Sequence, residues 1–152
     1  MKPTEAIARL TLSALLFAGS APSLSAAAPA VMPTVRAGYW ELTKTMPGRP
    51  PLVEHKCRGA AAPAVPLRKE CTTLAVNRAT DAKYLIDARC AARGMNMSLH
   101  VEVSGDLQTR FSGDLTSRMR MAPNQPEMVG HEHTDARYLG SCPAGMKPSD
   151  AG

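Results

Sequence analysis

Two successive segments of the chain, residues 95–104 and 107–121, alternate apolar and polar residues with a period of two. In the first segment the odd positions are apolar from Met95 to Val103. In the second segment most odd positions are apolar as well: Leu107, Phe111, Leu115, Met119 and Met121. Alternation of this kind is typical of antiparallel strands with one face against a core and the other in water. These segments therefore predict an all-β fold.

The rest of the chain supports the same fold class, because helical periodicity is hard to find after residue 38. Further strands are expected at residues 38–46, 52–57, 71–76, 82–90 and 128–142. Turns rich in Pro, Gly and Asp separate most of them, and residues 58–70, with two prolines, form a longer loop. Seven consecutive strands predict an antiparallel meander that forms a small barrel or half-barrel, since closure removes exposed edges. A β-sandwich is the alternative.

The first 27 residues have the pattern of a signal peptide. Lys2 and Arg9 precede an apolar run at 10–19, which is too short to span a bilayer, and small residues favour cleavage near Ala27. We therefore expect a secreted, periplasmic protein without a transmembrane segment after cleavage.

The remaining chain is long enough for one domain with a hydrophobic core, but not for two. We expect a flexible leader at 28–37, one β domain at 38–143 and a disordered tail at 144–152. The formal net charge is +5, but the basic residues are scattered along the chain without interleaved aromatic residues. This pattern argues against nucleic-acid binding.

Four cysteines in an exported domain predict two disulfide bonds. A zinc site would need short paired spacings such as C-x-x-C, which are not present. Cys71 and Cys90 stand at the outer ends of an expected hairpin, where the two strands bring them opposite each other. We therefore favour the pair Cys71–Cys90, which leaves Cys57 to pair with Cys142 and to tie an early strand to the last one.

The order of these features resembles the domain of unknown function 3617 family of bacterial periplasmic proteins, over about residues 37–143. The features are a G-x-W-E motif, four cysteines, a Met-rich strand, an S-G-D turn and a final R-Y-L-G-S-C: Gly38, Trp40, Glu41, Cys57, Cys71, Cys90, Ser104, Gly105, Asp106 and 137–142. The resemblance implies export, four cysteines and a mostly β fold, and it transfers no activity or site residues. The chain departs from the family pattern at 131–133, where His-Glu-His replaces alternating Met and Lys or Thr.

Methionines supply one candidate metal site. The Met-x-Met pairs at 95–97 and 119–121 could each offer two thioether sulfurs, which suit Cu(I): Met95, Met97, Met119 and Met121. The alternative is that these methionines fill gaps in an apolar stripe. Because each one is in phase with the apolar positions of its strand, we interpret them as core residues.

The segment at 131–135, HEHTD, supplies a second candidate metal site. Two imidazoles and one carboxylate share a face of the expected strand: His131, His133 and Asp135. If Met121 lies opposite Met128, then Asp114 lies opposite Asp135. The alternative is a solvent-exposed sheet face on which charged residues pair across strands.

A small barrel can hold one apolar ligand at its open end. We expect Glu132 on the inner face, opposite Ser117, with Trp40 and Phe111 near the same pocket. The sequence contains no convincing catalytic motif and implies no cofactor. We therefore expect a non-catalytic binding or structural envelope module, for a small hydrophobic ligand, rather than an enzyme. The alternative function is periplasmic copper handling, through the methionine pairs or the His-x-His strand.

Overall fold

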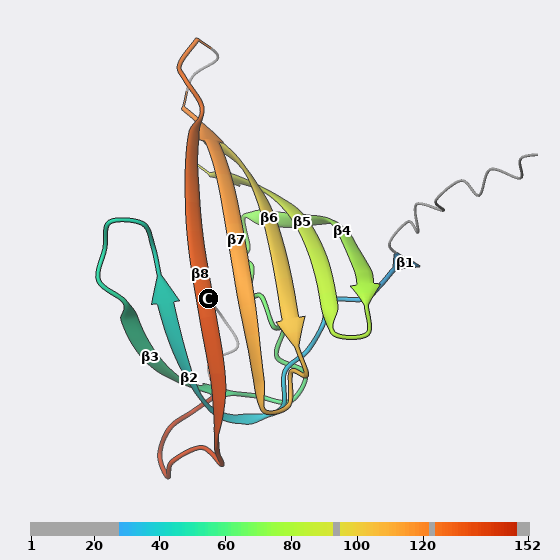
Figure 1. The fold of residues 1–152 in the computed structure, drawn as a ribbon, viewed down its shortest axis with the longest axis vertical. Helices are drawn as coiled ribbons and strands as arrows, with labels where there is room; N and C mark the ends of the chain where they lie inside the picture. The colour runs from blue at the N-terminus through green and yellow to red at the C-terminus, as the bar shows by residue number, and fades with distance from the viewer. Residues whose placement is uncertain (1–27, 93–94, 122–123, 149–152) are drawn as a thin grey trace, which may run out of the picture.

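The computed structural model describes residues 28–92, 95–121 and 124–148, which form a single antiparallel sheet (Figure 1). The expected signal peptide, and residues 149–152 of the expected tail, lie outside the described residues. The order in the sheet is β1-β4-β5-β6-β7-β8-β2-β3. The strands are β1 (Ala28–Pro29), β2 (Gly38–Thr45), β3 (Leu52–Arg58), β4 (Cys71–Thr80), β5 (Lys83–Ala92), β6 (Met95–Gly105), β7 (Arg110–Arg120) and β8 (Met128–Gly140).

The all-β antiparallel prediction is confirmed, and the seven long strands match the seven expected ones. Strand β8 pairs with β2, as it would in a closed barrel. However, β3 and β4 do not pair, and Figure 1 shows them on opposite sides of the sheet. The sheet therefore has the half-barrel form, with β3 at one edge and the short β1 beside β4 at the other.

The alternating pattern separates the sheet into an inner, apolar face and an outer, polar face. The inner face carries the core, and its largest fully buried side chains include Trp40, Ile86 and Val103, each at most 1% exposed. Trp40 packs against Phe111 and Tyr138, with ring centroids 5.5 and 5.4 Å away. The indole Nε1 donates a hydrogen bond to the Arg36 carbonyl at 2.9 Å, so the buried donor is satisfied.

An open sheet needs a second layer to bury its apolar face. Here irregular chain supplies it: residues 59–70, which we call the cover loop, connect β3 to β4, and residues 30–37 pack beside them. Val35 is 4% exposed and donates its N–H to the Ala62 carbonyl at 2.9 Å. Ala64 donates in turn to the Pro33 carbonyl at 2.8 Å. Val35 of the leader that we expected to be flexible is thus packed in the core, whereas Val31 is exposed.

Both predicted disulfides, Cys71–Cys90 and Cys57–Cys142, are present, and the part of the chain that the structure describes has no free cysteine. Cys71 and Cys90 are register partners on β4 and β5. Cys57 joins β3 to the segment after β8, and the strands β3 and β8 lie on either side of β2 in the sheet. This second bond stabilises one side of the open sheet and does not close a barrel. One cysteine of each bond flanks the cover loop.

The S-G-D turn between β6 and β7 is organised by Asp106. Its carboxylate accepts hydrogen bonds from the backbone N–H groups of Gln108, Thr109 and Arg110, and from the Thr109 hydroxyl. These bonds, led by those of Thr109, lower the pKa of Asp106 well below its usual value. Gly105 has φ +130°, and a Cβ there would lie 2.6 Å from the Arg110 carbonyl oxygen. The turn therefore requires glycine and a charged aspartate in succession.

Candidate functional site

A cavity of about 330 Å³ lies on the inner face, between the sheet and the cover loop. This volume is within the range of small-molecule pockets, about 300–1,000 Å³. Strands β6 and β7 supply much of an apolar floor, and residues 64–68 of the cover loop form a wall. The apolar lining residues are Leu42, Ala64, Val65, Pro66, Leu67, Leu99, Val101, Val103, Phe111 and Leu115. The cavity can therefore take an apolar molecule or the apolar part of one.

Four cationic side chains also line this cavity: Lys44, Lys56, Arg58 and Arg68. The ammonium groups of Lys44 and Lys56 lie 3.2 and 3.4 Å from the Glu54 carboxylate, so two cations share one anion. Partial burial raises the pKa of Glu54, but these two lysines outweigh burial and lower it overall. Glu54 is thus ionised at neutral pH, and the cavity lining keeps an excess of positive charge.

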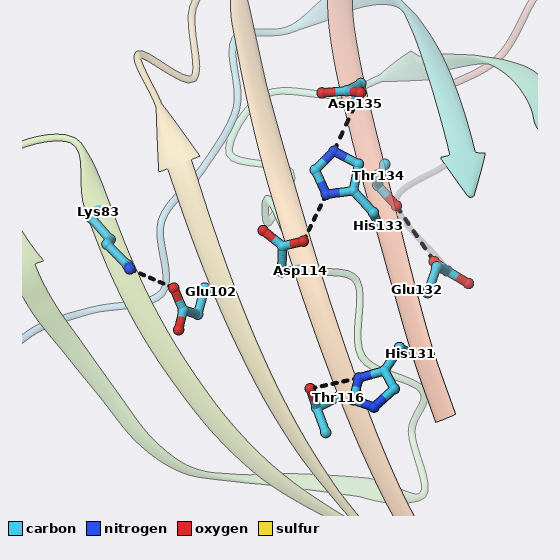
Figure 2. A network of polar contacts seen from close by, with 9 residues as sticks. All are labelled: Lys83, Glu102, Asp114, Thr116, His131, Glu132, His133, Thr134 and Asp135. Carbon is cyan, nitrogen blue, oxygen red and sulfur yellow. Dashed lines mark hydrogen bonds and ion pairs between the residues drawn. The ribbon is translucent and has the colours of Figure 1, made fainter. Parts of the chain in front are cut away.

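Glu132 lies on the inner face as predicted and lines the cavity. Its register partner is Leu115, not the expected Ser117. The Thr134 hydroxyl donates to the Glu132 carboxylate at 3.4 Å, and Figure 2 shows this pair on the other side of β8 from the histidines. Phe111 lines the cavity too, whereas Trp40 lies in the core beside it.

The outer face carries a polar network on β7 and β8 (Figure 2). His133 lies between two carboxylates: Asp114 is 2.7 Å from Nδ1 and Asp135 is 3.3 Å from Nε2. The hydrogen bond to Asp114, reinforced by the charges of both aspartates, raises the pKa of His133 despite partial desolvation. The predicted register between these strands is wrong by two residues, because Met119 lies opposite Met128. Asp114 consequently faces His133 rather than Asp135.

The structure brings together only part of the second candidate metal site. His133 and Asp135 are in contact, but the His131 ring contacts the Thr116 hydroxyl at 3.3 Å. Within residues 28–92, 95–121 and 124–148, no group of three or more His, Cys, Asp or Glu side chains has an arrangement that could hold a metal ion. The same outer face carries further cross-strand pairs: His100 with Asp87, His55 with Glu41, and Lys83 with Glu102.

The methionines lie on the inner face, at the end of the sheet next to the Cys71–Cys90 disulfide. Met97, Met119 and Met128 are successive register partners on β6, β7 and β8. Met95 and Met121 lie one position beyond the last paired residues, Asn96 and Arg120. Our interpretation of the predicted four as core residues is wrong, because none belongs to the buried cluster or packs against it. Met128 was not among the predicted ligands, although its inward phase could have indicated it.

The fold and the cavity define the class of protein: a disulfide-bonded, open β half-barrel with a ligand-sized cavity on its inner face. The chain belongs to the family described as Protein of unknown function (DUF3617), whose model matches residues 35–142. Comparisons with curated proteins and with solved structures find no match. Nor do the described residues form a helix of the length and apolar character needed to cross a membrane.

Proposed function

We propose that this protein is an exported, non-catalytic binding module that holds a small amphipathic anion in the cavity under the cover loop. The observation that carries this proposal is the combination, in one cavity, of an apolar floor and cationic side chains. An apolar chain would lie over Leu99, Val101 and Leu115, where burial contributes about 25 cal/mol per Å² of apolar area. An acidic head group would lie toward the cationic residues.

The charge balance favours an anion over a neutral ligand. The lining residues include four cations and one carboxylate, that of Glu132, while Glu54 pairs with Lys44 and Lys56. Counting both carboxylates, and leaving aside the buried Arg58, one positive charge remains. A carboxylate or phosphate in this partly desolvated space gains charge-assisted hydrogen bonds that an alcohol or amine head group does not.

Export to the periplasm is part of this proposal. Structural disulfides persist in oxidising compartments, and the two bonds in this small domain fit such a location. The N-terminal pattern of basic, apolar and small residues is what a secretory signal requires. Mass spectrometry of the protein recovered from a periplasmic fraction tests this directly: we expect a chain that begins at Ala28 and carries no free thiol. Recovery of the uncleaved chain from the cytoplasm would contradict it.

Ligand binding is tested by calorimetry with three probes of equal chain length: dodecanoate, dodecanol and dodecylamine. We expect dodecanoate to bind most tightly and dodecylamine most weakly, with the difference decreasing as salt is added. Equal binding of all three would contradict the role of the cations. If none of the three binds, the proposed function is wrong.

Neighbouring residues of the cover loop provide a matched pair of variants. Arg68 lines the cavity and Lys69 does not. Arg68→Gln should weaken dodecanoate binding about twofold to fivefold, because one partly exposed ion pair contributes this much to affinity. Lys69→Gln should leave dodecanoate binding unchanged. Leu99→Gln, on the floor, should weaken both dodecanoate and dodecanol.

A further inference from the structure

Five methionines gather at one end of the inner face, although the sequence spreads them over three strands and a turn. The central three, which we call the methionine row, are the register partners Met97, Met119 and Met128. Met95 and Met121 flank this row. None of the five lines the ligand cavity, so the row is a separate feature of the inner face.

Core packing does not account for this cluster. The buried hydrophobic residues of the described chain include no methionine, and Met121 and Met128 are 55% and 45% exposed. Exposed apolar side chains that adjoin one another are uncommon on soluble proteins and mark sites of interaction. Among apolar side chains only methionine and cysteine carry a donor atom for metals, and the nearby cysteines are joined in a disulfide.

We propose that the methionine row binds one Cu(I) ion through its three thioether sulfurs. Neighbouring strands lie about 4.8 Å apart, so Met97 and Met128 are about 10 Å apart with Met119 midway between them. Methionine has three rotatable bonds beyond its backbone and adapts to irregular spaces. The two outer side chains can therefore lean toward the middle one and place their sulfurs around a single ion above the sheet.

Small residues lie beside the row on β7 and β8. The adjacent inner-face row consists of Leu99, Ser117 and Gly130, of which the last two are too small to cover the methionines. On the outer face of the same end, Glu127 is held by Arg118 at 3.0 Å and by Arg120 at 3.9 Å. The sulfurs are thus the ligand atoms of this site, and neutral soft sulfurs select Cu(I) over Zn(II).

Binding is tested on the oxidised protein with Cu(I) kept reduced by ascorbate, in competition with a chromogenic Cu(I) chelator. Ag(I), which has the same charge and a similarly soft character, serves as a second probe that needs no reductant. We expect one Cu(I) per chain. NMR of methyl-labelled methionine should show shifts at Met97, Met119 and Met128, with no shifts at Met32 and Met146.

Leucine substitutions separate the metal role from packing, because leucine keeps the volume and removes the sulfur. Met97→Leu/Met119→Leu should lower Cu(I) affinity at least 100-fold, while Met32→Leu/Met146→Leu should leave it unchanged. If the double variant in the row fails to fold, the single Met128→Leu variant, at a half-exposed position, gives the same test with a loss of at least tenfold.

Equal Cu(I) binding by the row variant and the control variant would overturn the proposal, as would equally tight binding of Zn(II). A row that binds no Cu(I) or Ag(I), but whose substitution weakens dodecanoate, would instead assign the methionines to the ligand cavity. Binding of Cu(I) by a protein that binds none of the dodecyl probes would support the metal site and contradict the proposed function alone.

Discussion

Asp114 and His133 lie opposite each other on β7 and β8, with the aspartate Oδ1 2.7 Å from the imidazole Nδ1. On the same face, Asp135 approaches Nε2 at 3.3 Å, and Glu102 lies opposite Asp114 from β6. A protonated imidazole satisfies the carboxylates on both sides of it. This arrangement makes the stability of the sheet depend on pH.

The pKa of His133 is higher in the folded chain than the value of about 6.5 expected when unfolded. Protonation therefore favours folding. The stabilisation is complete below the unfolded pKa and is lost as the pH rises through the folded pKa. We expect the free energy of urea unfolding of the wild type to exceed that of His133→Gln at pH 5.5, and the two values to converge as the pH rises through the folded pKa. His131→Gln, which removes only a contact with a hydroxyl, should show no such convergence.

Gly105→Ala should lower the free energy of unfolding by about 1–3 kcal/mol, because L-residues rarely adopt a φ of +130°. The added Cβ would also lie 2.6 Å from the Arg110 carbonyl oxygen. Gly113→Ala is the matched control, since the nearest atom to a Cβ there lies 4.0 Å away. Chemical denaturation of both variants checks this, and an unchanged midpoint for Gly105→Ala would contradict the described turn.

Trp40→Phe should destabilise the protein by about 2–4 kcal/mol, through a cavity in the core and an unsatisfied carbonyl at Arg36. The change leaves the packing partner Phe111 in place, so the circular dichroism of the sheet should persist at low temperature. The measurement is the thermal midpoint. A shift as small as that of Tyr39→Phe, which removes only a hydroxyl at a half-buried position, would argue against the buried position.

Removal of the two disulfides should lower the free energy of unfolding by different amounts. The two cysteines of Cys57–Cys142 are 85 residues apart in the sequence, and those of Cys71–Cys90 are 19 residues apart. The chain-entropy relation gives about 4.6 and about 3.2 kcal/mol for these loops. Paired Cys→Ser variants, compared by urea unfolding, should therefore rank in that order. The reverse order would indicate residual structure in the unfolded chain.

Much of the fold could be predicted from local patterns. Period-two alternation located the strands and their inner faces, and the hairpin geometry identified Cys71–Cys90. The register between β7 and β8 was missed by two residues, because a shift of two leaves every side chain on the same face and the apolar pattern unchanged. That error placed Asp114 beside the wrong residue, and only the three-dimensional pairing shows that it faces His133.

Long-range packing accounts for the other differences. The segments at 30–37 and 59–70 have no periodicity, yet Val35 and Ala64 are buried because the open sheet offers them an apolar face. The methionines were in phase with the apolar positions of their strands. The phase of a residue predicts which face of the strand it lies on, but it does not predict how far along the strand that face is buried. Met97 and Met119 lie beyond the end of the core cluster.

The cover loop is fastened at both ends, since Cys57 and Cys71 stand on either side of it, Cys57 bonded to Cys142 and Cys71 to Cys90 on the neighbouring strand. Both ends of the loop are therefore held against the sheet while the two bonds are intact. Cleavage of either bond would leave that end held only by the pairing of its strand within the sheet. If the proposed ligand binds beneath the loop, its residence time should then fall even though every residue in contact with it is unchanged.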